Sequence, residues 1–197
     1  KPLIAYSIDV GKKSKFITDL IVSTDDEEIA DVAKSFGVEV PFIRPAELAT
    51  DDAGHLEVMQ HAINFMEKRN NLIYDYVVIL QPTSPLRNLD DLDGTIDKLI
   101  KSNADSAVSL VEISNNHPLK AKKMDGDRVL PYFDVEPEGI RRQNLPKAYK
   151  RNGSVYAMRR DLIIKNNRLY GENIVGYEVP SERSIDIDDY SDWLLAE

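Results

Sequence analysis

The sequence contains no cysteine, which excludes disulfide bonds, zinc sites built on thiolates and cysteine nucleophiles. Because the absence of cysteine suits a reducing compartment, we expect a cytoplasmic protein. The apolar runs are far shorter than a membrane span, and the N-terminal residues lack the basic-then-apolar layout of a signal peptide. We therefore expect a soluble protein with no membrane partner.

Positive charge is scarce as well, since 34 acidic residues outnumber 25 lysines and arginines and give a net charge of −9. Non-specific nucleic-acid binding needs a net basic surface that displaces counterions from phosphates. We expect no nucleic-acid partner, whereas a small anionic ligand remains compatible with local basic clusters. The three histidines have no spacing that places two metal ligands on one helix face, and no Gly-x-Ser-x-Gly nucleophile motif is present.

What the sequence does contain is an alternation of short apolar runs with helical patterns. Strand-like runs occupy residues 19–23, 38–43, 76–80, 107–111, 154–158 and 174–179, and helical patterns occupy 24–36, 54–69, 89–99 and 190–197. The alternation implies right-handed crossovers and therefore a doubly wound α/β fold with a mostly parallel, Rossmann-like sheet. A length of 197 residues suits a single domain over 1–197.

Capping signals predict where some helices begin. Thr24 and Glu27 have the spacing of a capping box, which would open a helix with Ile29 on its apolar face. Asn88 is a suitable cap for the helix that follows residue 88.

The pattern loosens between residues 114 and 150, where four prolines punctuate a polar stretch: Pro118, Pro131, Pro137 and Pro146. One strand is expected there, over 129–133. A long irregular insertion in a compact domain is usually functional or forms an interface.

The segment LQPTSPLR follows the buried strand 76–80 directly. In open α/β sheets ligands bind beyond the carboxyl ends of the strands, which places this loop on the ligand side. Gln81 can donate and accept hydrogen bonds, Thr83 and Ser84 offer hydroxyls, and Arg87 can meet an anion or fix the loop. Ligand binding and a rigid turn remain equally supported by composition.

Two aspartates alternate near the C-terminus. In an extended segment, Asp186 and Asp188 share one side while Ile185 and Ile187 point to the core. Two close carboxylates repel unless a proton or a cation intervenes, and hard oxygen ligands suit Mg²⁺. The alternative is that Asp188 or Asp189 caps the final helix; we favour a metal for the first pair and a cap at Asp189.

Other polar groups have a functional and a structural interpretation. The two guanidinium groups of Arg141 and Arg142 suit a carboxylate or phosphate, or form a solvated positive surface. Arg44 could hold a phosphate or a base, or pair with nearby Glu47. Asn152 and Gly153 predict a tight turn, with the Asn152 amide as a candidate for facing the site.

Six segments in this order resemble the CMP-sialic acid synthetases, or acylneuraminate cytidylyltransferases, including those that activate legionaminic and pseudaminic acids. The segments are KPLIAYSI, IVSTDDEEIA, RPAELATD, LQPTSPLR, RRQNLPKAYKRNGSVY and SIDIDDYSDW. The resemblance covers nearly the whole chain. It implies a nucleotidyltransferase fold and Mg²⁺-dependent transfer of CMP from CTP to the anomeric hydroxyl of a nine-carbon 2-keto sugar acid, with release of pyrophosphate.

The resemblance also implies residue roles. Asp186 and Asp188 match metal-binding aspartates, and Arg142 matches an arginine that faces the sugar acid and the reacting groups, so these three are the catalytic candidates. Substrate-binding roles are implied or proposed for the following residues: Gln81 and Tyr156 at the sugar, Arg44 and the position of His55 at cytidine, Gln143 and Asn152 in the pocket, and Lys120 or Lys122 in the site of a partner subunit.

The family is homodimeric, so we expect the insertion at 114–150 to be a small dimerisation lobe. The family also begins with a strand and a loop resembling ARGGSKGxPxKN, which we expect ahead of Lys1. Where the family has two aromatics near the partner's sugar pocket, this chain offers Leu169 and Tyr170. Two alternatives remain: transfer to the eight-carbon acid KDO, which fits RRQNLP less well, and a non-catalytic nucleotide-sugar-binding protein.

Overall fold

The structure is a computed structural model that describes residues 1–50, 53–113, 115–133 and 139–197, with the side chain of Arg142 outside the described part. Its helices are α1 (Leu3–Gly11), α2 (Glu27–Ser35), α3 (His55–Asn70), α4 (Leu89–Ser102), α5 (Arg160–Ile164) and α6 (Tyr190–Ala196). Its strands are β1 (Tyr76–Leu80), β2 (Ser106–Glu112), β3 (Lys122–Asp125), β4 (Arg128–Pro131), β5 (Tyr149–Arg159) and β6 (Ile174–Glu178).

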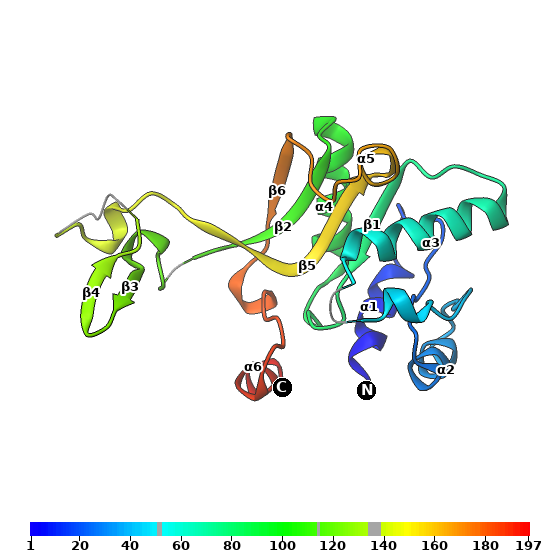
Figure 1. Ribbon diagram of the computed structural model, residues 1–197, viewed down its shortest axis with the longest axis horizontal. Coiled ribbons are helices and arrows are strands. Elements are labelled where there is room, and N and C mark those ends of the chain that lie inside the picture. Colours follow the sequence, from blue (N-terminus) through cyan, green and yellow to red (C-terminus); the bar gives the residue numbers. More distant parts are fainter. Residues whose placement is uncertain (51–52, 114, 134–138) are drawn as a thin grey trace.

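Four strands form the central sheet in the order β1-β5-β2-β6. Strand β5 is antiparallel to both β1 and β2, whereas β2 and β6 are parallel. Strands β1, β2 and β6 therefore point the same way and β5 opposes them. This confirms an α/β fold with a mostly parallel sheet, and Figure 1 shows the helices gathered around it.

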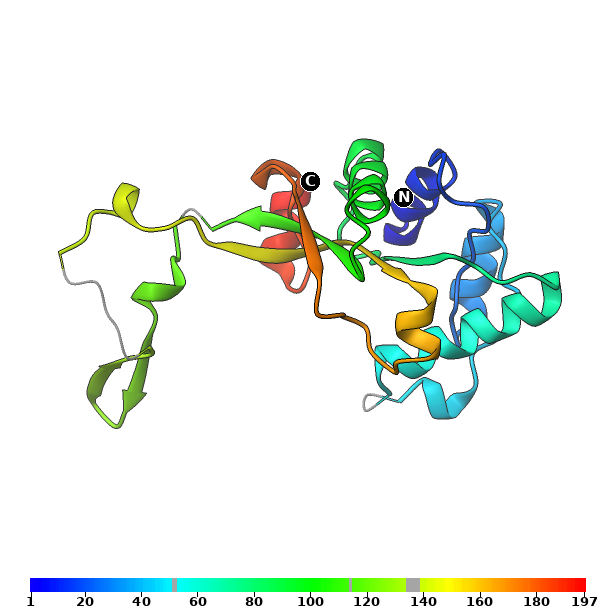
Figure 2. The ribbon, with the colours of Figure 1, turned by 90° about the horizontal axis from the view of Figure 1, so that it is seen from above.

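Helices cover both faces of the sheet, as Figure 2 shows. Val78 and Leu80 of β1 pack into the cluster that contains buried leucines of α4, whereas Val77 and Ile79 pack against α3 and α5. Because neighbouring strand residues point to opposite faces, a continuously apolar run is what two covered faces require. The prediction for residues 76–80 is confirmed.

The first two predicted strands, over 19–23 and 38–43, are wrong as regular strands. Only two isolated parallel bridges join these extended segments, between Ile21 and Glu39 and between Thr24 and Ile43. The segments nevertheless run side by side, with the Val22 N–H donating to the Glu39 carbonyl over 2.9 Å.

Helix starts agree with the sequence at two places and differ at one. Asn88 caps α4 and Asp189 caps α6, each in a reciprocal capping box. The expected box at Thr24 is wrong, because Asp26 caps α2 by accepting from the Ile29 N–H at 2.9 Å. Ile29 is 45% exposed and lines a cavity, one helical turn from the buried Ala33.

Asn152 and Gly153 do not form the predicted tight turn. Both lie within β5, which begins earlier than expected and pairs with β2 through a change of register between Val108 and Leu110. Gly153 has a φ of +76°, a left-handed conformation that favours glycine. The glycine therefore marks a bulge in a long strand.

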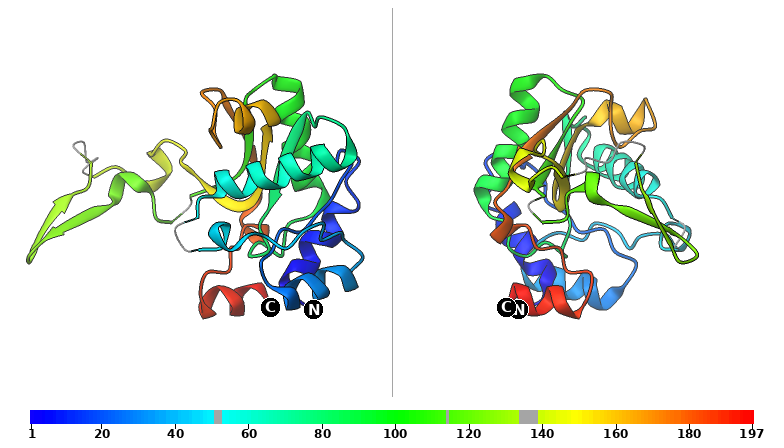
Figure 3. Two further views of the ribbon diagram at one scale, coloured as in Figure 1. Left: turned by 45° about the vertical axis from the view of Figure 1, so that its right-hand side comes forward. Right: turned by 90° about the vertical axis from the view of Figure 1, so that its left-hand side faces the viewer.

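A two-stranded hairpin, β3 with β4, forms a separate sheet. Figures 1 and 3 show it at the end of an arm that projects from the body of the molecule. The arm lies within the insertion predicted at 114–150. The strand predicted at 129–133 is the shorter β4, and β3 was not predicted. Ser114 and Pro137 lie outside the described residues. Helices that are long and apolar enough to cross a membrane are absent from the described part of the chain.

Candidate functional site

The loop at 81–87, which follows β1, is built around the buried guanidinium of Arg87. This side chain is 4% exposed and donates to the Gln81 carbonyl at 2.7 Å, the Ser154 carbonyl at 2.8 Å and Ser7 Oγ at 2.9 Å. Three elements are thereby joined: the loop, β5 and α1. The rigid-turn interpretation is therefore confirmed for Arg87, which supports the loop from inside.

Burial lowers the pKa of Arg87 to about 10, and the charges of Asp91 and Asp186 oppose that shift. Arg87 consequently stays protonated at neutral pH. Its positive charge sits behind the loop and faces the segment that carries Asp186.

Asp186 lies against β5 and the same loop. Ser84 Oγ, which is buried, donates to Asp186 Oδ1 at 3.4 Å. A side chain at Gly153 would overlap the Asp186 carboxylate and would lie 3.0 Å from Ser84 Oγ. The bulge in β5 thus places a glycine where the carboxylate passes closest to the strand.

Asn152 is buried, and both ends of its amide are bonded within the protein. Its Oδ1 accepts from Ser109 Oγ at 2.6 Å, and its Nδ2 donates to Ser184 Oγ at 2.9 Å. This geometry fastens the segment before Asp186 to β5. The predicted contact of Asn152 with substrate stays a prediction.

Tyr156 of β5 is half-buried and lies near enough to Asp186 for the charge of that carboxylate to act on its hydroxyl. Its ring centroid lies 6.4 Å from that of Tyr170, and the Arg151 guanidinium sits 4.9 Å from the Tyr170 centroid. Burial raises the pKa of the Tyr156 hydroxyl, with the neighbouring Tyr170 adding to the effect. The tyrosine is therefore a neutral hydrogen-bonding group beside a carboxylate.

Asp188 is exposed, and its backbone N–H donates to Asp192 Oδ2 at 3.1 Å. The cap at Asp189 is confirmed, because its carboxylate accepts from the Ser191 and Asp192 N–H groups. No group of three or more His, Asp or Glu residues placed to hold a metal occurs among the described residues. Mg²⁺ is commonly held by one or two carboxylates together with phosphate oxygens and water, so the Asp186 and Asp188 donor set fits this ion.

Arg44 lies elsewhere in the body of the protein. Its guanidinium pairs with Asp25 and not with Glu47, and its backbone N–H donates to the Thr24 carbonyl at 2.8 Å. The Arg44 Nε is buried without a hydrogen-bond partner. Its predicted contact with cytidine stays a prediction.

Four of the predicted residues lie on the arm, and one of them, Lys122, begins β3. Lys120 ends a short 3-10 helix, Pro118–Lys120, and residues 142 and 143 belong to another, Arg142–Asn144. The side chains of Lys120 and Gln143 are exposed. In the body of the chain, Asp186 lies near Ser84 and Tyr156, and Asn152 is bonded to Ser184 in the segment before it. The arm projects away from the body, as Figure 1 shows. The predicted roles of Gln81 and Asp188 stay predictions.

A cavity of about 560 Å³ runs along β1. All of β1 and residues 16–24 line it, together with His55 and Pro82, and no residue of β5 does. Ser23 Oγ, on its wall, is buried without a partner. The cavity is thus on the edge of β1 away from β5.

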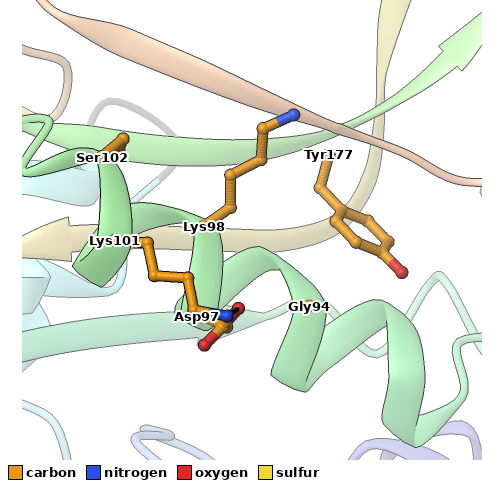
Figure 4. A pocket seen from close by; sticks show the side chains of 6 residues that line it. All are labelled: Gly94, Asp97, Lys98, Lys101, Ser102 and Tyr177. Atoms are coloured by element: carbon orange, nitrogen blue, oxygen red, sulfur yellow. Dashed lines mark ion pairs between the residues drawn. The ribbon is translucent and has the colours of Figure 1, made fainter.

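Another pocket, of about 520 Å³, lies between α4 and β6 (Figure 4). Its lysines are engaged within the protein: Lys98 donates to the Gly176 carbonyl, and Lys101 pairs with Asp97 at 2.7 Å. None of the predicted site residues lines it.

Sequence reasoning missed the pair Asp91 and Arg183. Arg183 Nε and Nη2 donate to the two Asp91 oxygens at 3.0 and 2.8 Å. The residues are 92 positions apart, and no local pattern links them.

A family model described as cytidylyltransferase matches residues 1–170. The chain belongs to the cytidylyltransferase family. As a cytidylyltransferase it is a nucleotidyltransferase enzyme. The resemblance carried by the six sequence segments is therefore confirmed at family level.

Curated relatives of this cytidylyltransferase cover almost its whole length. It is 35% identical to the CMP-N,N'-diacetyllegionaminic acid synthase of Legionella pneumophila, over 100% of this chain and 84% of the relative. It is 31% identical to the pseudaminic acid cytidylyltransferase of Campylobacter jejuni, over 98% and 82%. The N-acylneuraminate cytidylyltransferase of Escherichia coli is 29% identical, and the chain spans 45% of its length.

Solved structures show the same fold. A CMP:2-keto-3-deoxy-manno-octonic acid synthetase complexed with CTP superposes with a TM-score of 0.64 at 18% identity, over 92% of this chain and 80% of that one. A 4-diphosphocytidyl-2C-methyl-D-erythritol synthase from Anaerococcus prevotii gives 0.66 at 15% identity, over 98% and 83%.

Proposed function

We propose that this cytidylyltransferase transfers CMP from CTP to the anomeric hydroxyl of a sialic-acid-like nonulosonic acid, which is a nine-carbon 2-keto sugar acid. The observation that supports this most is the similarity, along almost the whole of this chain, to relatives named for legionaminic, pseudaminic and N-acylneuraminic acids. The sugar oxygen bonds to the α-phosphorus, the bond to the bridging oxygen breaks, and pyrophosphate leaves while the hydroxyl loses its proton.

The protein's task in such a reaction is to align two substrates and offset phosphate charge, with little need for a nucleophile. Asp186 and Asp188 would hold Mg²⁺, which supplies polarisation of phosphate oxygens and lowers the pKa of a bound hydroxyl. The Arg87-supported loop positions Gln81 beside this segment, where we assign it to the sugar. Tyr156 borders the same space and offers a neutral hydroxyl.

We also propose that the enzyme works as a homodimer through the arm. Val129 is 62% exposed, and its partner across the hairpin, Met124, is exposed as well, which leaves apolar surface on an element without a core of its own. Lys120, Arg142 and Gln143 lie on this arm, so a second subunit would present them to the Asp186 site. A cytoplasmic location, which the absence of cysteine favours, completes the proposal.

A substrate panel tests the proposal. The full-length protein, with CTP and Mg²⁺, is assayed for pyrophosphate with N-acetylneuraminic, legionaminic and pseudaminic acids and with KDO. Release with a nine-carbon acid supports the proposal. Pyrophosphate release with KDO alone would assign the eight-carbon acid as the substrate. CTP binding without pyrophosphate release in the presence of any acid would indicate a non-catalytic nucleotide-binding protein.

A further inference from the structure

Asp186 and Asp188, the proposed metal ligands, lie in a segment that is attached to the rest of the protein mainly through the residues next to them in sequence. The Asp186 carboxylate accepts a long hydrogen bond of 3.4 Å from Ser84 Oγ, and Asp188 is exposed. By contrast, Ser184 Oγ accepts from Asn152 Nδ2 at 2.9 Å, and the Ile187 N–H donates to the Thr83 carbonyl at 2.8 Å. The position of the aspartates therefore depends on how the chain on either side is held.

Arg183 provides the strongest of these attachments. It lies three residues before Asp186, in the short 3-10 helix Ser181–Arg183. Its guanidinium donates two parallel hydrogen bonds to the Asp91 carboxylate. Asp91 is 0% exposed, and its Oδ2 also accepts from the Asn88 N–H at 3.1 Å within the cap of α4. A planar fork of this kind fixes direction as well as distance, which a single point charge does not.

We infer that the Arg183–Asp91 pair is a positioning device that sets the geometry of the Asp186 and Asp188 metal site from the start of α4. The inference rests on the proposed function for its metal, and it assigns Arg183 no contact with substrate. In Figure 1 the connection from β6 to α6 lies at the same end of the body as the loop that follows β1. Helix α4 begins directly after that loop, so one buried carboxylate ties the helix, the loop end and the metal segment together.

The pair does more than stabilise the fold. A purely structural ion pair would change the free energy of unfolding and leave metal affinity alone. A positioning pair changes the affinity for the ion, because groups that orient metal ligands typically contribute roughly 10- to 100-fold to affinity. The two roles are therefore separated by measuring metal binding and unfolding on the same variants.

The test uses Arg183→Lys in the full-length protein, with Arg168→Lys as a matched control. Lysine keeps the charge opposite Asp91 but loses the two-point contact. Arg168 is an exposed arginine that pairs with Glu172 at 3.7 Å, away from the metal segment. The probe is Mn²⁺ in the presence of CTP, followed by electron paramagnetic resonance, alongside the Mg²⁺ concentration for half-maximal pyrophosphate release.

For Arg183→Lys we expect the Mn²⁺ dissociation constant and the half-saturating Mg²⁺ concentration to rise roughly tenfold or more. The KM for the sugar acid at saturating Mg²⁺ stays within about twofold of wild type, and Arg168→Lys matches wild type throughout. Unchanged Mn²⁺ and Mg²⁺ values in a folded Arg183→Lys variant overturn the inference.

If Arg183→Lys does not unfold cooperatively, the neutral pair Asp91→Asn with Arg183→Gln takes its place, since it leaves no unpaired buried charge. Weaker Mn²⁺ binding in that double variant supports the inference, and wild-type binding overturns it. Failure of the proposed function has a different signature, because wild-type protein would then release no pyrophosphate with any of the nine-carbon acids. The Mn²⁺ comparison still decides the role of Arg183 in that case.

Discussion

The backbone N–H of Ile187 donates to the carbonyl oxygen of Thr83 over 2.8 Å, which joins the aspartate segment to the loop after β1. This bond fastens together two stretches that are far apart in sequence. The loop in turn is supported by the buried guanidinium of Arg87. Binding groups on the loop and metal ligands on the segment consequently share one rigid frame, which is what alignment of two substrates requires.

Replacing Gly153 should damage this frame. In Gly153→Ala the new methyl group overlaps the Asp186 carboxylate, and alanine must also adopt the left-handed φ of +76°. We therefore expect the unfolding free energy to fall by roughly 1–3 kcal/mol and turnover to fall markedly. Urea unfolding and pyrophosphate release measure the two effects. Gly126→Ala is the control, since it has a φ of +57° with no atom within 4 Å. Equal turnover in both variants would contradict the close approach of Asp186.

Arg87 should matter for stability more than for chemistry. Arg87→Met removes the donor to the Ser154 carbonyl and to the Ser7 hydroxyl, and it leaves the Gln81 carbonyl with the longer bond of 3.3 Å from Ser7 Oγ, so we expect a loss of roughly 2–4 kcal/mol. Urea unfolding at neutral pH measures it. Arg168→Met, at an exposed arginine, should change stability by less than about 0.5 kcal/mol. A similarly small change in stability for Arg87→Met would contradict a supporting role of Arg87.

The ion pair between Glu67 of α3 and Arg160 of α5 predicts a pH dependence. Arg160 donates to both Glu67 oxygens, at 2.9 and 2.7 Å, and these bonds lower the pKa of Glu67 below its ordinary value near 4.5 despite partial burial. A carboxyl whose pKa is lower in the folded state stabilises the fold at pH values above its unfolded pKa. That contribution is lost as the pH falls below about 4.5 and through the folded pKa.

Urea unfolding of wild type and Glu67→Gln across this range checks the sign. The wild type should be more stable at pH 7, and the difference should shrink toward acid. A difference that stays constant or grows between pH 6 and pH 3 would show that Glu67 does not gain its stabilising charge from Arg160.

The arm gives a prediction about assembly. Val129→Asp places a charge on the exposed apolar side of the hairpin, where it costs the single chain little, and we expect it to convert a dimer into a monomer. Light scattering after size-exclusion chromatography measures the mass. Lys123→Ser, at an exposed position in the same hairpin, should remain dimeric. A wild-type monomer at micromolar concentration would contradict the proposed homodimer.

Local signals in the sequence were sufficient for much of the fold. Strand β1 and the cap of α4 at Asn88 were predictable, because continuous apolar residues and a capping side chain act within a few positions. The bulge at Gly153 was not, since a glycine with a neighbouring asparagine is typical of a turn and only pairing with β2 shows otherwise. The Asp91–Arg183 pair was equally inaccessible, because its partners meet only in the folded chain.

The measurement closest to the central claim is a Mg²⁺ titration of CMP-sugar formation by wild type and Asp188→Asn, with the preferred nine-carbon acid. The substitution removes charge at an exposed side chain, so thermal unfolding should be nearly unchanged. We predict Mg²⁺-dependent product formation in wild type and a loss of at least about 100-fold in Asp188→Asn. Wild-type rates and Mg²⁺ dependence in a folded Asp188→Asn variant would contradict the account.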